Sequence, residues 1–295
     1  YRESRRDEYC GLSREYNKNL EILTELMNRV PVDTAQTNWF GQKVEDLKDT
    51  GYVTPKEMGQ NMTANQIYES GKTIAGELTK IGINLNLAPV ADLASDQNPS
   101  YAMRCLGSDA DGVADLLDDF VSGMREGGLS VTLKTFPGIG NVSADVTESI
   151  AENTDSLMTI RDTNFVPYAS GIQAGADCVM VSNVAYSKLT VKKVPAFMSQ
   201  DIVTKLLREE LGFDGIVMTS PLNDNVIENN YTNEFAVVEA VKAGCDLIVL
   251  PGNFKECYEA LITAVEEGRI DEKVINTSVR RILQNKIQRG ILVLE

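Results

Sequence analysis

The sequence Ser130-Val-Thr-Leu-Lys-Thr-Phe-Pro-Gly-Ile-Gly-Asn-Val-Ser-Ala-Asp-Val-Thr147 joins a short apolar run to a long polar loop. Residues 130–133 predict a buried strand. Residues 136–140 end it, because proline fixes φ and glycine opens backbone angles that are closed to other residues. Functional side chains concentrate in loops that follow strands. Residues 134–147 therefore form either a functional loop or an ordinary exit from a strand, and the segment by itself supports both interpretations equally.

A unit made of an amphipathic helix, a glycine and an apolar strand recurs on both sides of this segment. Thr63 and Gln66 have the spacing of a capping box at the start of the first helix, and Ser199 is the expected N-cap of the fourth. Strands that are apolar on both faces are typical of parallel sheets covered by helices. The expected helices cover residues 63–81, 113–124, 165–174, 199–211 and 233–243, and the strands after them cover 83–90, 129–133, 178–182, 215–219 and 246–250.

Two folds fit five successive units of this kind, a TIM-type (β/α)8 barrel and a doubly wound sheet. The barrel is favoured because no G-x-G-x-x-G sequence opens a helix after the first strand. Helices at 260–265 and 274–287 would close it. We therefore expect one barrel domain over residues 1–295, well formed over 63–295 and irregular or incomplete over 1–62.

The composition excludes several classes of function. A net charge of −15 disfavours nucleic acid and anionic membranes as partners, and no run of about 18 apolar residues predicts a membrane span. The chain has no histidine, which excludes His-ligated zinc and Ser-His-Asp triads. Its five cysteines are scattered without a C-x-x-C pair, so we expect no disulfide framework, metal site or cofactor.

Five segments, in their order and spacing, resemble the family-3 glycoside hydrolases over residues 63–287, and among them the single-barrel β-N-acetylhexosaminidase branch. The segments are Gly-Ile-Asn-Leu-Asn-Leu-Ala-Pro-Val-Ala-Asp (82–92), Arg104 in a stretch like the family's Arg-Ser-Phe-Gly, and residues 174–182, 207–215 and 278–283. The resemblance implies a TIM-type barrel, hydrolysis of O-glycosyl bonds, and a site at the carboxyl ends of the strands.

The catalytic positions of that family carry other residues here. The family loop reads Lys-His-Phe-Pro-Gly-His-Gly-Asp-Thr-x-x-Asp-x-His; its first two histidines are replaced by Thr135 and Ile139, and the third, the general acid/base, by Thr147. The nucleophilic Asp of the family's Thr-Asp-x-Leu is replaced by Ser220. A further family histidine is replaced by Asn183.

Neither Ser220 nor Thr147 suits the parent reaction. A retaining glycosidase needs a carboxylate nucleophile about 5 Å from an acid/base group. A serine needs a neighbouring base to attack, and a threonine hydroxyl does not exchange protons near neutral pH. Asp145, Glu148 and Asp224 are the carboxylates that could substitute, unless they are solvated loop acids or backbone caps.

The resemblance nominates five residues as ligand contacts: Arg104, Lys134, Thr135, Asn183 and Asp33. Arg104 and Lys134 could bind sugar hydroxyls or a carboxylate, or instead belong to a residual network with Asp92, Asp145 or strand-end carbonyls. Asp33 matches the first residue of the family's Asp-x-Glu-Gly-Gly segment, whose glycines are missing here.

Three hypotheses follow. The favoured one is a non-catalytic barrel that binds a sugar or a peptidoglycan fragment, or acts as an interaction module. The second is an active, divergent glycosidase with relocated carboxylates. The third is a scaffold whose barrel mouth is closed by Ile139 and Pro221. Because the chain starts at Tyr1 without methionine, we expect a removed signal or anchor and an extracellular or cell-surface bacterial location, with the cytoplasm as the alternative.

Overall fold

The computed structural model describes residues 53–139, 142 and 149–293. Asp33, Asp145, Thr147 and Glu148 lie outside the described residues. Residues from Thr54 onward form one compact unit.

The unit is built on a parallel sheet whose strands follow the order of the chain. The strands are β1 (Leu85–Asn86), β2 (Ser130–Phe136), β4 (Cys178–Val181) and β6 (Ile216–Thr219), hydrogen-bonded in the order β1-β2-β4-β6. A parallel bridge between Met218 and Leu247 continues the sheet to a fifth position. A sheet that adds each new strand beside the previous one, without a reversal of direction, is the arrangement of a TIM-type barrel and not of a doubly wound sheet.

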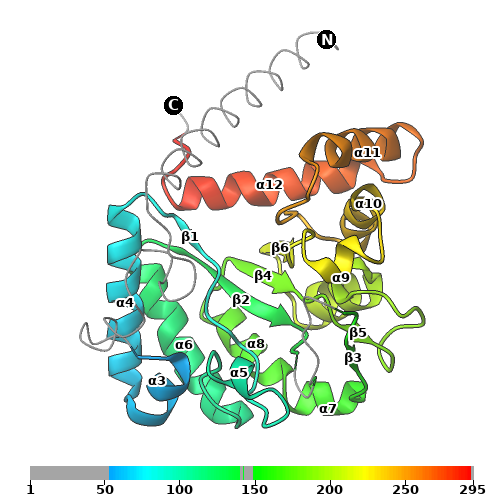
Figure 1. Cartoon of the computed structure of the whole chain (residues 1–295). Coiled ribbons are helices and arrows are strands. Elements are labelled where there is room, and N and C mark those ends of the chain that lie inside the picture. Colours follow the sequence, from blue (N-terminus) through cyan, green and yellow to red (C-terminus); the bar gives the residue numbers. More distant parts are fainter. Residues whose placement is uncertain (1–52, 140–141, 143–148, 294–295) are drawn as a thin grey trace, which may run out of the picture. The chain divides into compact units, whose positions relative to one another are not determined.

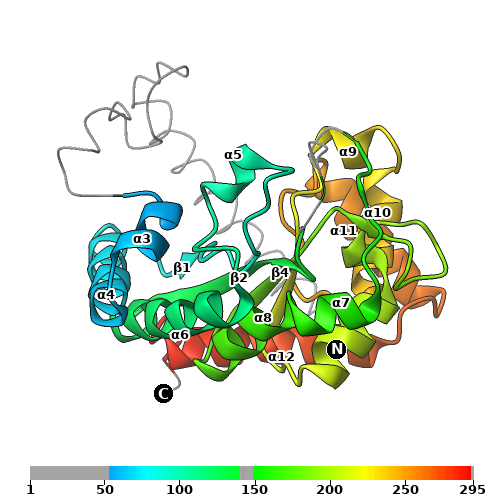
Figure 2. The ribbon, with the colours of Figure 1, turned by 90° about the horizontal axis from the view of Figure 1, so that it is seen from below.

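The helices that connect these strands cover the outer face of the sheet. They are α4 (Ala64–Lys80), α6 (Ala110–Glu126), α8 (Phe165–Gln173), the wider π-type helix η2 (Asp201–Glu210) and α10 (Asn233–Ala243). Figure 2 shows α4, α6 and α8 next to one another along this face. Two glycines allow the closest approach: a Cβ on Gly71 would lie 2.6 Å from the Phe120 carbonyl oxygen, and one on Gly123 would lie 2.1 Å from that of Tyr68. Larger residues there would push α4 and α6 apart.

Two further helices, α11 (Phe254–Glu266) and α12 (Glu272–Gln288), follow the fifth position. In Figure 1, α12 crosses one end of the strands while α5 (Pro99–Ala102) and α7 (Leu157–Asp162) lie at the other. Buried acids at the amino ends of the strands hold α12. Asp246 accepts hydrogen bonds from Arg281 (3.1 Å) and Ser278 (2.7 Å), and Asp177 accepts from Asn285 (3.1 Å).

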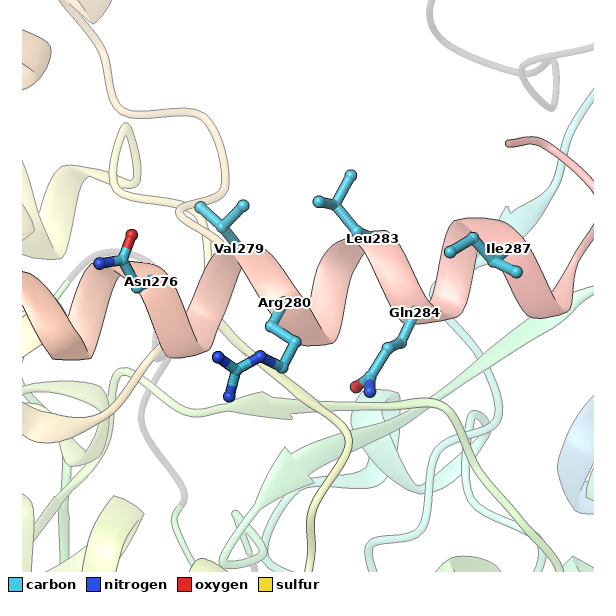
Figure 3. Close-up of a pocket in the computed structure, with 6 residues that line it drawn as sticks. All are labelled: Asn276, Val279, Arg280, Leu283, Gln284 and Ile287. Atoms are coloured by element: carbon cyan, nitrogen blue, oxygen red, sulfur yellow. The ribbon is translucent and has the colours of Figure 1, made fainter. Parts of the chain in front are cut away.

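The two faces of α12 differ. Ile282 packs against an apolar cluster on the strands that includes Met180 and Met218. On the other side Val279, Leu283 and Ile287 are 45%, 42% and 39% exposed and line a shallow pocket made by this single helix (Figure 3).

Four further elements complete the part of the unit that the structure describes. They are α3 (Pro55–Asn61), α9 (Asn225–Glu228), the 3-10 helix η1 (Ala196–Met198) and a small second parallel sheet of β3 (Glu152–Asn153) and β5 (Ala185–Tyr186). Within the described part of the chain, no helix is long and apolar enough to cross a membrane.

Three local expectations are wrong. Residues 55–61, expected to be irregular, form α3, which a capping box between Thr54 and Glu57 starts. Ser199 does not cap η2; Gln200 occupies that position, and no side chain caps the helix. The expected strand at 246–250 is reduced to the bridge at Leu247, because Asp246 is drawn into the ion cluster below the sheet and Leu250 takes a positive φ of 45°.

Candidate functional site

The sequence-predicted site residues that the structure describes lie where the parallel strands end. Lys134 and Thr135 lie near the carboxyl end of β2, Asn183 follows β4, and Ser220 follows β6. The backbone of Lys134 is fixed on one side by its N–H donating to the Pro89 carbonyl (3.2 Å) and by its own carbonyl accepting from Ala91 (2.8 Å). The end of β2 is therefore bound directly to the segment that follows β1.

Asp92 is the centre of the polar network at this end of the sheet. Its side chain is fully buried and accepts five hydrogen bonds. Oδ2 accepts from Tyr101 Oη (2.6 Å), Thr135 Oγ1 (2.8 Å) and the Ile139 N–H (3.3 Å), and Oδ1 accepts from the Thr135 N–H (3.1 Å) and Tyr168 Oη (3.0 Å). Burial raises the pKa of Asp92, and the hydrogen bonds from Tyr101 and Thr135 oppose that effect.

The network fixes the loop that leaves β2. Ile139 N–H reaches back to Asp92, and the carbonyl of Gly138 accepts from Tyr186 Oη (2.8 Å). Gly138 has φ of 110°, and a Cβ at this position would lie 1.9 Å from Asn164 Nδ2, so no other residue fits. The expectation of a shaped loop is correct for residues 136–139. Ile139 itself is 3% exposed, which places its side chain in the core.

Lys134 and Arg104 are the two cations of the site. Lys134 is half-buried, and neither a hydrogen bond nor an ion pair of its ammonium group occurs among the described residues. The pKa of Lys134 is lowered to about 8, chiefly by burial and also by the positive charge of Arg104, while Asp92 partly opposes both effects. Arg104 is exposed, with its guanidinium 5.2 Å from the centre of the Tyr101 ring.

Neither cation hydrogen-bonds Asp92, although the charge of Asp92 acts on Lys134. The alternative of a residual network with Asp145 lies outside the described residues. All five donors to Asp92 are hydroxyls and backbone N–H groups. A carboxylate offers about four lone-pair positions, so it has no room for an ammonium or guanidinium in addition. Arg104 and Lys134 remain candidates for ligand contact, whereas the hydroxyl of Thr135 is already bound to Asp92.

Ser220 and Asn183 form the other side of the site. Ser220 is 6% exposed, and its Oγ donates to the carbonyl of Val181 at 2.9 Å. Asn183 Nδ2 donates to Asp224 Oδ2 at 2.8 Å, while its Oδ1 is buried and has no partner in the described part of the chain. The structure thus joins Asn183 to Asp224, and the serine at the nucleophile position is bound to the backbone.

Two residues of this network, Tyr101 and Tyr168, could not be predicted as site residues from the sequence. Tyr168 lies within the apolar face of α8, where an aromatic residue reads as core, and it does pack edge-on against Phe136 at 5.2 Å. Its hydroxyl and that of Tyr101 reach Asp92 from positions 76 and 9 residues away. The spacing of apolar residues along a helix predicts that a tyrosine ring is buried, but it does not show whether the hydroxyl joins a polar network.

The fold and the position of these residues define a TIM-type (β/α)8 barrel with a polar site at the carboxyl ends of its strands. Residues 24–285 match the model of the glycosyl hydrolase family 3 N terminal domain, and the chain belongs to this family.

Similar sequences and solved structures agree with this family assignment. The chain is 32% identical over 183 residues to the beta-hexosaminidase of Xylella fastidiosa (strain M23), which covers 62% of this chain and 54% of the relative. It is 33% identical over 219 residues to the beta-hexosaminidase of Stenotrophomonas maltophilia (strain K279a), covering 74% and 62%. A glycoside hydrolase family 3 beta-N-acetylglucosaminidase from Paenibacillus sp. str. FPU-7 superposes with a TM-score of 0.78 at 33% identity, covering 82% of this chain and 48% of that one. The chain thus spans about half the length of several proteins that it matches.

Proposed function

We propose that this chain is a non-catalytic member of the family that binds a carbohydrate or a peptidoglycan fragment at the carboxyl ends of its strands. The observation that carries the proposal is the state of Ser220. The residue at the position of the family nucleophile is uncharged, and its hydroxyl already donates to the Val181 carbonyl. Within the described part of the chain, a serine in this state has no base to activate it, and it cannot replace a carboxylate that attacks a sugar.

The acid nearest to Ser220 in sequence does not restore the missing role. Asp224 accepts a hydrogen bond from Asn183, and a second acid would have to lie at about 5 Å for retention or about 6.5–9.5 Å for inversion. Asp92 does not supply it, because its oxygens are fully occupied. Asp145 and Glu148 stay candidates for a divergent glycosidase, which the names of the hexosaminidase relatives favour.

Incubation with chromogenic N-acetylglucosaminides and glucosides tests the proposal. We expect no release of chromophore above a protein-free blank. Turnover that disappears in Asp224→Asn or Asp145→Asn would overturn the proposal in favour of the divergent glycosidase. Turnover that survives both variants would equally overturn it and would point to an unassigned catalytic group.

A closed scaffold is the second candidate, since Ile139 is buried where the family has a histidine. A thermal-shift titration separates the two candidates, because a ligand that binds only the native state raises the melting temperature. A shift with any of the sugars tested supports binding. The extracellular or cell-surface location belongs to the same proposal, and cell fractionation checks it.

A further inference from the structure

Among the described residues, neither cation of the site forms an ion pair, and the buried Asp92 is the only acid there whose charge acts on Lys134. Lys134 is half-buried, and within the described ranges its ammonium group has no hydrogen bond or ion pair. The charge of Arg104 acts on Lys134, and the Arg104 guanidinium lies over the Tyr101 ring. The Tyr101 hydroxyl is 3.1 Å from Thr135 Oγ1. A half-buried ammonium beside a second cation is costly unless an anion joins it.

Asp92 and Asp224, the two carboxylates of the site that the structure describes, are already engaged by other groups. Asp92 is saturated by five donors, none of which is a cation. Asp224 is bound to Asn183. Ser220, at the end of β6, is neutral, whereas the family that the chain resembles has its carboxylate nucleophile there. Strands β2 and β6 are separated only by β4, so Lys134 and Ser220 lie at the same end of adjacent parts of the sheet.

We propose that the ligand of this site is a sugar acid, whose carboxylate takes the place of the missing acidic side chain and pairs with Lys134 and Arg104. The inference deepens the proposed carbohydrate binding and rests on it. A neutral sugar suits two cations when a protein carboxylate balances them; once serine replaces that carboxylate, the balancing charge has to arrive with the ligand. Arg and Lys together provide donors for both oxygens of a carboxylate. Because the chain as a whole carries a charge of −15, two neighbouring cations without an ion pair in the described ranges are not a consequence of general basicity.

Titration calorimetry with two matched pairs of sugars tests the inference. The pairs are N-acetylmuramic acid with N-acetylglucosamine, and glucuronic acid with glucose, and each pair differs in a carboxylate-bearing group. We expect at least one acid to bind about tenfold or more tightly than its neutral counterpart, with the difference shrinking between 50 and 500 mM NaCl as salt screens the charges. A preference within the first pair indicates recognition of the ether-linked carboxylate of N-acetylmuramic acid. A preference within the second pair indicates recognition of the carboxylate of a uronic acid.

Substitutions test whether Lys134 and the neutral Ser220 cause the preference for the sugar acid. Lys134→Met removes the charge and keeps most of the side-chain volume, and we expect it to abolish the preference for the acid. Lys80→Met makes the same change at the exposed C-terminal end of α4, next to the amino ends of the strands, and should leave the preference intact. Ser220→Asp should also remove the preference by returning a carboxylate to the site. Ser220→Asn, whose amide has the size and shape of that carboxylate but no charge, should retain it.

The outcomes separate this inference from the proposed function. Equal binding of acid and neutral sugar, or a preference that survives Lys134→Met, overturns the sugar-acid inference and leaves carbohydrate binding standing. Absence of binding by all four sugars overturns both. Hydrolysis of a chromogenic substrate overturns the non-catalytic proposal without bearing on the charge preference.

Discussion

At the scale of single residues, the site is organised by a buried carboxylate that contacts no cation. Asp92 draws the hydroxyls of Tyr101 and Tyr168 and two backbone N–H groups toward one point, and this fixes the direction in which β2 leaves the sheet. Asp92 contacts Thr135 directly and so positions Thr135 and the neighbouring Lys134 in the proposed ligand site. Its own oxygens are not available to a ligand.

Replacing Asp92 tests that structural role. Asp92→Asn puts an amide group among five donors, so at least one of them loses its acceptor while buried. We expect the free energy of unfolding to fall by about 2–3 kcal/mol, against about 1–2 kcal/mol for Tyr168→Phe, which removes one of the five hydrogen bonds. Urea denaturation of both variants measures the two losses. An Asp92→Asn protein as stable as the wild type would show that the network contributes nothing.

The pKa of Lys134 predicts how sugar-acid binding depends on pH. The free amine titrates at about 8, under the influence of burial, Arg104 and Asp92, while burial holds the pKa of the neighbouring Tyr101 well above its usual value and that of Cys105 at about 12. A bound carboxylate favours the ammonium form and raises the pKa in the complex. The affinity for the sugar acid is therefore highest below about pH 8. It falls as the pH rises above that value, by up to tenfold per pH unit.

Calorimetry with glucuronic acid between pH 6 and pH 10 measures this dependence. Lys134→Met should give a weaker and flat profile over the same range. A wild-type affinity that stays constant up to pH 10 would mean that the amine does not contact the anion.

At the scale of secondary-structure elements, α12 is held to the sheet by charge. Asp246 is fully buried and accepts from Arg208, Arg281, Ser278 and the backbone of β6. Breaking a buried ion pair leaves the remaining charges without a partner.

Asp246→Ala should therefore lower the free energy of unfolding by about 3–5 kcal/mol. Asp201→Ala, which breaks an exposed pair with Lys205 on η2, should cost no more than about 0.5 kcal/mol. Chemical denaturation followed by circular dichroism compares the two. Similar small losses would show that the cluster does not hold α12.

Most of the helices could be predicted from the sequence because their end signals are local. Thr63 and Gln66 form the expected capping box, and Gly244 ends α10 in the left-handed conformation. The same signal, Thr54 with Glu57, would have revealed α3, but the stretch around it lacks helical periodicity. Strand lengths were less predictable, since hydrogen bonding to neighbouring strands decides where a strand ends. The sequence at 83–90 alternates over eight residues, yet β1 pairs over two.

At the scale of the whole molecule, the order of the strands in the sheet follows from the order of the helix–strand units in the sequence. The side-chain contacts of the site do not follow from it. Five helix–strand units in a row specify a sheet that adds strands in sequence, and motif resemblance places Lys134, Asn183 and Ser220 at strand ends. The contacts among them depend on side chains brought together across long separations. The pairing of Asn183 with Asp224 and the saturation of Asp92 could be seen only in three dimensions.

The central claim is that a glycoside hydrolase scaffold here binds sugar without cleaving it. Ligand-observed NMR tests both parts in one sample, with the protein mixed with the disaccharide of N-acetylglucosamine and N-acetylmuramic acid. We predict saturation transfer from protein to sugar, together with no new anomeric signals after a day. New anomeric signals of the free monosaccharides, absent from a protein-free sample, would contradict the account.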